Sequence, residues 1–455
     1  MLPYRWLALS TILFPTEKAI SCVFDADIEL YGQVSYVHKK ASSWEIGGED
    51  PYSSDNSYND VALKYQNRCE LIENKLNLNI NAYGLAYSSY KDTGNFEQDN
   101  QHVKLLLNQF SLSYQLSDTL SLDTGKLKNN DGLFYLKSPT ALLNNYYAGF
   151  KPTRIHDSAM DQIYSESFWG ISLTQDTEDY SLAITVAPKL TEIDERYVSS
   201  SNWSSLERSN SRERYLFRYT DYHFKDHTPT VSLGLGDAVS IAFSNSYNIT
   251  QQLTMNAEIA WHNKQQWHHL NRENAQLVQN YLFPNDLYQI KKKDGFEIAL
   301  GMQYTSDRFS QFGFEYYYQS EGYSKQQWNE QKNLIQFLNR TTNFEPLDSA
   351  FDSYKYLMAS EIYNTSSQGN LTGKHYINSY ASILMADQST IKPYVVMNLV
   401  DKSTVSGITY TKPFNIRTQQ VDIYTGIYAA LGRNDSEFGL FGETVGTYVG
   451  FNYHF

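Results

Sequence analysis

The chain ends in VGTYVGFNYHF, residues 445–455, and this stretch decides the fold. Its residues fall into two alternating rows, because successive side chains of a strand point to opposite faces. One row includes Val445, Val449, Phe451 and Phe455, and the other holds glycine, tyrosine, asparagine and histidine. Such a strand suits a wall between lipid and water, although a soluble β-sandwich can also end on one.

The same two-row pattern returns in the interior of the chain. Between Lys75 and Tyr87, leucine, isoleucine, alanine and glycine alternate with lysine, asparagine and tyrosine. Three further copies run over residues 253–261, 296–304 and 311–321. We expect the apolar rows to face lipid and the polar rows to face a wet lumen. The polar rows of the three later copies contain Glu258, Glu297 and Glu315.

The connections between these segments alternate in length. Short, turn-rich links such as residues 176–179 and 249–252 are followed by long polar segments. Transmembrane barrels have short periplasmic turns and long outer loops, so the alternation predicts an all-β fold, a transmembrane antiparallel β-barrel. The predicted outer loops lie near Lys128–Ile163, Lys189–Ser211, Asn263–Asp294 and Gly322–Gly373.

With both chain ends in the periplasm, the number of strands must be even. We predict about eighteen strands, or sixteen if one of the least regular pairs, around Leu233 and Ile408, is absent. The predicted strand centres are Gly32, Lys64, Asn81, Phe110, Asp123, Trp169, Ile184, Phe217, Leu233, Ala242, Ala257, Leu300, Phe314, Tyr380, Val396, Ile408, Thr425 and Val449.

The composition agrees with a barrel and excludes helical membrane spans. Mean hydropathy is -0.52, and no apolar run approaches the ~20 residues that a spanning helix needs. Aromatic residues make up 15% of the chain, with 38 Tyr and 23 Phe, and such side chains fit the interfacial belts of membrane proteins. The net charge of -13 makes a nucleic-acid partner unexpected.

The N-terminus reads as an export signal. Arg5 supplies a positive charge, an apolar stretch follows over residues 6–14, and small residues follow at 19–21. We therefore expect residues 1–21 to be a signal peptide and residues 22–455 to be the barrel with its long loops. Lipid attachment at the following cysteine is the alternative.

The chain contains two cysteines, Cys22 and Cys69. Cys22 precedes the first predicted strand and Cys69 ends the second, so both are expected on the periplasmic side. Because that compartment is oxidising, adjacent strands would allow a disulfide between them, and two isolated thiols are the alternative.

No sequence pattern indicates catalysis, and we expect neither an enzyme nor a cofactor. HExxH, GxSxG, Walker and paired CxxC motifs are absent. A barrel protease needs Asp and His at the outer rim, whereas Asp226 and His227 fall in a predicted periplasmic turn. We interpret His262, His268 and His269 as solvated loop residues and predict no metal site.

The segment after the fifth predicted strand is the most distinctive loop. It runs from Gly125 through Gly132 and Ser138 to Asp157, and it resembles the inward loop of large solute and polysaccharide porins of Gram-negative outer membranes. That resemblance implies a loop folded into the lumen, where charges of both signs would form a constriction; a solvated surface loop is the alternative. The charged residues concerned are Lys126, Lys128, Asp131, Lys151, Arg154 and Asp157.

The terminal strand ending at Phe455 also resembles the signal that such proteins present to the barrel-assembly machinery. The resemblance places the chain in the outer membrane of a Gram-negative bacterium, surrounded by outer-membrane lipid.

The resemblance to these porins implies passive diffusion of small hydrophilic solutes. Exporters of anionic polysaccharide line their lumen with arginine, whereas the polar rows here are mostly Asn, Gln, Tyr and Glu with occasional Lys, which better suits neutral or weakly cationic hydrophilic solutes. Carbohydrates are among these, because Tyr and Asn on a channel wall can stack on sugar rings and hydrogen-bond to them. A barrel for polymer export or secretion, and a surface receptor or adhesin barrel, are the alternatives. Oligomeric state is left open by the sequence.

Overall fold

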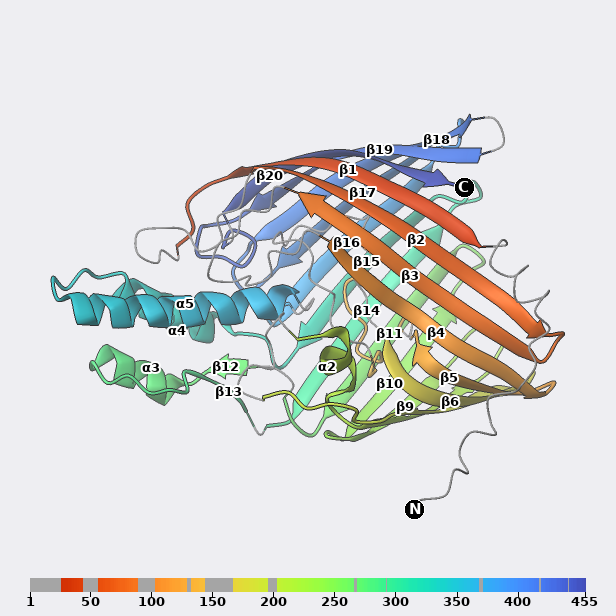
Figure 1. Cartoon of the computed structure of the whole chain (residues 1–455), viewed down its shortest axis with the longest axis horizontal. Coiled ribbons are helices and arrows are strands. Elements are labelled where there is room, and N and C mark those ends of the chain that lie inside the picture. The colour runs from red at the N-terminus through yellow and green to blue at the C-terminus, as the bar shows by residue number, and fades with distance from the viewer. Residues whose placement is uncertain are drawn as a thin grey trace, which may run out of the picture.

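The computed structural model describes residues 26–43, 56–88, 103–128, 132–143, 167–194, 203–265, 268–291, 293–367, 371–416, 419–440 and 442–455. Eighteen strands form one closed sheet (Figure 1). These strands are β1 (Asp27–Lys39), β2 (Ser57–Ile72), β3 (Leu76–Ser88), β4 (Val103–Ser117), β5 (Leu120–Leu127), β6 (Phe168–Asp176), β7 (Tyr180–Ala187), β8 (Arg214–Asp221), β9 (Thr230–Gly236), β10 (Ser240–Asn248), β11 (Leu253–His262), β14 (Gly295–Thr305), β15 (Gln311–Gln319), β16 (His375–Leu384), β17 (Thr390–Asn398), β18 (Thr404–Ile416), β19 (Gln419–Leu431) and β20 (Glu443–His454).

Each barrel strand pairs antiparallel with the next one along the chain, and β20 returns to β1. The closing pair places Val34 opposite Val449 and Gly32 opposite Phe451. The predicted fold class is therefore confirmed, and eighteen strands rather than sixteen are present. Every predicted centre lies within a barrel strand, including Leu233 in β9 and Ile408 in β18.

The two rows of each strand differ in burial as the alternation predicts. On β20, Val449 is 57% exposed on the outer face, whereas its neighbour Tyr448 is 4% exposed on the inner face. On β14, Leu300 and Met302 are exposed, whereas Ala299, next to Leu300 in the sequence, is buried. The exposed apolar rows make the outer wall suited to lipid.

Aromatic side chains gather on the outer wall near the short turns. Tyrosine and phenylalanine side chains favour the membrane interface, so this belt marks the membrane boundary at the end of the barrel with the short turns. Tyr180 and Tyr219 stack with ring centroids 5.9 Å apart, and Tyr304 lies 6.3 Å from Phe312. Exposed members of this belt include Tyr114, Tyr219, Tyr247, Tyr304 and Phe312.

A helical module stands beyond the opposite end of the barrel, on the left of Figure 1. The sequence predicts only long polar loops here, but the loops after β11 and β15 fold into helices with a shared apolar core. No helix in the described part of the chain is long and apolar enough to cross a membrane. The module contains β12 (His268–Leu270), α3 (Arg272–Gln279), β13 (Tyr288–Ile290), α4 (Lys325–Leu338) and α5 (Glu345–Ser367), and a separate short helix, α2 (Ser205–Asn210), precedes β8.

The predicted signal peptide and Cys22 lie outside the described residues. Cys69 is buried near the periplasmic end of β2. Asp27, at the start of β1, pairs with Gln66, so the chain enters the barrel close to Cys69. The proposed disulfide stays a prediction.

We expect protein exported to the cell envelope to carry a Cys22–Cys69 bond, because the periplasm is oxidising and Cys22 precedes Asp27 by only a few residues in the sequence. Mass spectrometry of peptides digested without reduction should detect the linked pair. Alkylation before reduction should label neither thiol, and alkylation after reduction should label both. Two labelled thiols in the unreduced protein would contradict the pairing.

Candidate functional site

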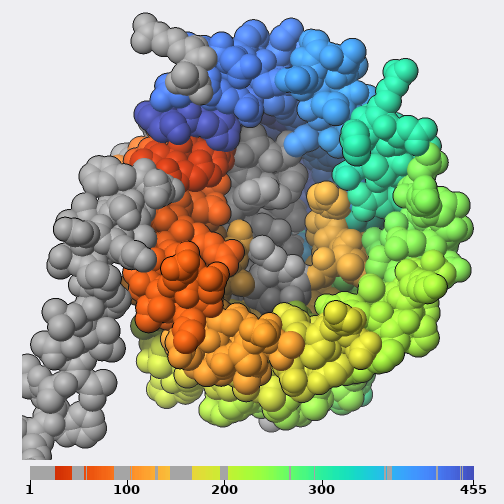
Figure 2. Space-filling view, turned by 90° about the vertical axis from the view of Figure 1, so that its right-hand side faces the viewer, coloured from red at the N-terminus to blue at the C-terminus, as the bar shows by residue number. Residues whose placement is uncertain are grey.

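Residues 132–143, part of the loop between β5 and β6, lie inside the barrel. Figure 2 looks into the end with the short turns, and a segment in the orange of this region lies within the ring of strands. Glu258, on the inner face of β11, accepts two backbone hydrogen bonds from it. The Leu133 N–H donates to Oε1 at 2.6 Å, and the Thr140 N–H donates to Oε2 at 3.1 Å.

A second carboxylate holds the middle of the same segment. Glu315, on the inner face of β15, accepts from the backbone N–H of Tyr135 at 2.9 Å and of Leu136 at 3.0 Å. Asn378 of β16 donates to the same carboxylate at 2.8 Å. Because hydrogen bonds to an ionised group are stronger than neutral ones, these two glutamates form a clamp on the loop backbone.

Apolar contacts support the clamp. Phe134 and Leu136 pack against the inner wall at Ala299, Tyr317 and Tyr376. Space for the Phe134 ring depends on Gly301, where a Cβ atom would come within 2.8 Å of it. The segment is thus packed on β14 and β15 as well as bonded to the glutamates beside them.

Tyr135 differs from its neighbours because its side chain is exposed to solvent. It is 69% exposed, and its ring centroid lies 4.4 Å from that of Tyr380 on β16. Tyr380 in turn lies over Gly313, where a Cβ atom would overlap the ring. This pair presents aromatic and hydroxyl groups to the lumen.

The expectation of a wet carboxylate row is wrong for this part of the wall. Glu258, Glu297 and Glu315 are all buried, two of them beneath the inner segment. Glu297 accepts from the Tyr317 hydroxyl at 2.7 Å and lies 3.7 Å from His262 Nε2. The sequence shows the face of a strand but not what covers it.

The other predicted constriction residues divide into three sets. Lys126 pairs with Phe110 and Trp169 across the sheet, and its ammonium group donates to Ser205 of α2 at 2.8 Å. Lys128 lies close enough to Lys64 of β2 for their charges to interact. The remaining four, Asp131, Lys151, Arg154 and Asp157, lie outside the described residues.

The sequence does not reveal that backbone N–H groups of residues 133–140 bind the two glutamates, because nearly every residue type has such a group. One feature of the sequence does indicate a compact turn here. Gly132 has a φ of +123°, a conformation that favours glycine, and Ser138 packs where its Cβ would be. The Ser138 hydroxyl accepts from the Phe134 N–H at 3.0 Å, which closes a compact turn.

The three histidines are buried, so their interpretation as solvated residues is wrong. His262 Nδ1 lies 2.8 Å from the Ser240 hydroxyl, and His268 Nδ1 lies 3.0 Å from a Glu361 oxygen. His269 donates from Nε2 to the carbonyl of Glu321. Each ring has its own partner, and the three do not converge as metal ligands.

One group of potential metal ligands does occur in the described ranges. Asp27, Glu29 and His454, at the periplasmic end of the β1–β20 seam, have ligand atoms within 4.8 Å of one another. Glu29 already forms an ion pair with Lys64 and accepts from Asn452 at 3.0 Å. These contacts account for the carboxylate without a metal.

Comparison with solved structures identifies the fold. OccAB1 of Acinetobacter baumannii matches with a TM-score of 0.53 and 9% identity, over 95% of this chain and 97% of that one. The chain has the fold of Gram-negative outer-membrane porins. OccK5 (OpdH) of Pseudomonas aeruginosa matches with a TM-score of 0.50 and 9% identity, over 95% and 98% of the two chains. No protein-family model and no curated protein matches the sequence.

A third barrel in this comparison is Wzi of Escherichia coli, an outer-membrane protein involved in group 1 capsule assembly and a carbohydrate-binding barrel. It matches with a TM-score of 0.48 and 9% identity, over 96% of this chain and 86% of that one. This score is too low to support a functional comparison. The porin fold and the apolar outer wall together place the barrel in the outer membrane. The porins named here are channels rather than enzymes.

Proposed function

We propose that the chain forms an outer-membrane channel through which small hydrophilic solutes diffuse passively. The observation that carries this proposal is the clamp of Glu258 and Glu315 on residues 132–143. A loop segment fixed on the inner wall narrows an eighteen-stranded barrel, as a size-selective channel requires.

The exposed Tyr135 beside Tyr380 favours polyhydroxylated solutes such as small carbohydrates. Aromatic faces stack on the apolar faces of sugar rings, and phenolic hydroxyls exchange hydrogen bonds with sugar hydroxyls. Charges on the same loop would add an electrostatic preference. We include Lys128, Asp131, Lys151, Arg154 and Asp157 in this proposed constriction and leave out Lys126, whose ammonium group is held by α2.

The helical module favours a second candidate, a surface receptor or adhesin. Its core has fifteen buried residues, among them Trp328, Phe351 and Met358, so it presents a stable surface outside the cell. Polymer export is less well supported, because a loop clamped on the inner wall would hinder the passage of a long polymer more than it would hinder the passage of a single sugar. Delivery to the membrane would use the barrel-assembly machinery acting on the strand that ends at Phe455.

Single-channel recording in planar bilayers tests the proposal. We expect purified full-length protein to give discrete single-channel current steps that persist over a range of applied voltages. Small sugars that enter the lumen should reduce this current. A matched preparation of heat-unfolded protein should give none. Folded protein that stays electrically silent would remove the channel proposal and favour the receptor.

A further inference from the structure

Three lysines, Lys291, Lys293 and Lys374, gather at the extracellular end of the barrel, and we call them the rim lysines. Lys291 and Lys293 lie in the link between β13 and β14, and Lys374 directly precedes β16. Because β14 and β16 flank β15 in the sheet, the two links come to the same part of the rim. The charges of Lys293 and Lys291 are close enough to Lys374 to act on it.

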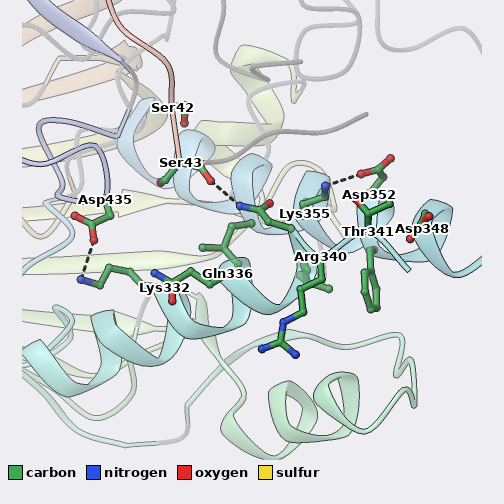
Figure 3. A pocket seen from close by; sticks show the side chains of 14 residues that line it. Ser42, Ser43, Lys332, Gln336, Arg340, Thr341, Asp348, Asp352, Lys355 and Asp435 are labelled. Atoms are coloured by element: carbon green, nitrogen blue, oxygen red, sulfur yellow. Dashed lines mark hydrogen bonds and ion pairs between the residues drawn. The ribbon is translucent and has the colours of Figure 1, made fainter. Parts of the chain in front are cut away.

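The helical module shows how lysines in this protein are neutralised elsewhere. Lys332 lies 3.0 Å from Asp435, and Lys355 lies 2.7 Å from Asp352 (Figure 3). In such a pair, a carboxylate of the protein offsets the charge of the ammonium group. A lysine cluster without carboxylate partners is therefore able to bind an anion from outside the chain.

The rim lysines have no such partner. In the described part of the chain, none of the three forms an ion pair or a side-chain hydrogen bond. The adjacent carboxylate, Asp294, accepts from the indole N–H of Trp261 at 3.4 Å. Burial lowers the pKa of the Lys374 ammonium group, and the like charges of Lys293 and Lys291 lower it further. An anion at this position would offset that repulsion.

Aromatic side chains on the outer wall lie next to the rim lysines in the sequence and in the sheet. Tyr318 has its ring centroid 6.5 Å from that of Phe296 and 4.9 Å from that of His375. The Tyr316 hydroxyl lies 2.8 Å from His375 Nδ1. Such side chains favour the boundary between hydrocarbon and lipid headgroups. His375 directly follows Lys374, so the rim lysines lie at the level of the headgroups of the outer leaflet.

We propose that the rim lysines bind the phosphate groups of lipopolysaccharide, the glycolipid that forms the outer leaflet of a Gram-negative outer membrane. Clustered lysines next to a membrane bind anionic lipid headgroups, and each ammonium group donates charge-assisted hydrogen bonds to phosphate oxygens. The rings of Phe296 and Tyr318 contact the lipid beneath its headgroup. The proposal requires only that the barrel is inserted in the outer membrane, so it is independent of the proposed channel.

Lipid binding by full-length protein tests the proposal. The protein is refolded in detergent, so that it carries no lipid from cells. Native mass spectrometry then follows the binding of diphosphoryl lipid A and of the same glycolipid with both phosphates removed. We expect saturable binding of the first and at least about tenfold weaker binding of the second, because charge-assisted hydrogen bonds are lost. Equal affinity for the two lipids, or no binding of diphosphoryl lipid A, would overturn the proposal.

Inorganic phosphate distinguishes a lipid site from a site for the free ion. At the same concentration as diphosphoryl lipid A, it should not displace the lipid, because it lacks the sugars and acyl chains that contact the outer wall. Displacement would show that the rim lysines recognise free phosphate, and it would contradict the assignment to lipid.

Charge variants locate the binding to the rim lysines. The triple variant Lys291→Gln, Lys293→Gln and Lys374→Gln should bind diphosphoryl lipid A about a hundredfold more weakly, at about fivefold for each lysine near the membrane surface. Arginine at the same three positions should preserve binding. Lys293 is exposed, so the single variant Lys293→Gln, with an expected loss of about fivefold, tests the site even where the triple variant fails to fold.

A matched control removes three charges from the other end of the barrel. Lys75, Lys225 and Lys392 are exposed near the short turns, and Lys75→Gln, Lys225→Gln and Lys392→Gln together should leave the affinity for diphosphoryl lipid A unchanged. Unchanged affinity in the folded rim variants, or an equal loss in the control, would mean that the lipid does not bind at the rim lysines.

Discussion

Replacing Leu300 with arginine is expected to destabilise the membrane-inserted barrel by about 2 to 4 kcal/mol, the cost of a cation on the lipid face near the bilayer midplane. Leu300 lies in the middle of β14 with its side chain on the outer wall. Phe296 and Tyr304 stand at the two ends of the same row. Equilibrium unfolding by urea in lipid vesicles measures the change.

Gln303 supplies the matched control, because it lies on the inner face of the same strand. Gln303→Arg should change stability by less than about 1 kcal/mol, since the inner row is not in contact with lipid. Asn79 on β3 offers a second inner position. Equal losses at Leu300 and Gln303 would contradict the assignment of the two faces. Glu297→Arg is not a suitable control, because Glu297 is buried against Tyr317.

The barrel itself could be predicted because its strands and turns are determined by residues close together in the sequence. Strand faces follow from a period of two, and turn lengths show which end of the barrel each link occupies. Even the two least regular pairs, around Leu233 and Ile408, were placed correctly. Neighbouring strands must alternate in direction, so the order of pairing needed no information about distant contacts.

The helical module is not predicted, because its apolar residues at helical spacing are interspersed with many polar ones. Ser324 and Gln327 form a capping box at the start of α4, and Ser204 and Glu207 form another at α2. Such pairs are visible in sequence and mark helix starts. Behind the first pair, Leu334, Ile335 and Leu338 recur at helical spacing and are all buried.

The site was predictable only in part, because the burial of an inner-face side chain depends on whether a loop folds onto the wall and covers it. Glu258 and Glu315 could be assigned to the inner face from their strands. Their partners could not, because backbone N–H groups carry no residue identity and the loop that supplies them is distant in sequence. His268 and His269 were misread for a similar reason, since the module that buries them was not expected.

The clamp predicts a large change in conductance. In the double variant Glu258→Gln and Glu315→Gln, each side chain keeps one acceptor oxygen and gains an NH₂ group that faces a backbone N–H. Each lost hydrogen bond to a charged group is worth about 1.5 to 3 kcal/mol, so residues 132–143 should detach from the wall for part of the time. We expect larger and noisier single-channel currents than in the parent protein.

Aspartate variants separate loop release from loss of charge. Glu258→Asp with Glu315→Asp keeps both negative charges but shortens each side chain by one methylene, so the carboxylates no longer reach all four N–H groups. If the clamp narrows the channel, the aspartate variant should also raise the conductance, with cation preference unchanged. If charge alone matters, only the glutamine variant should change the current, and it should do so by lowering cation preference. That second result would leave the inner segment without a role in the width of the channel.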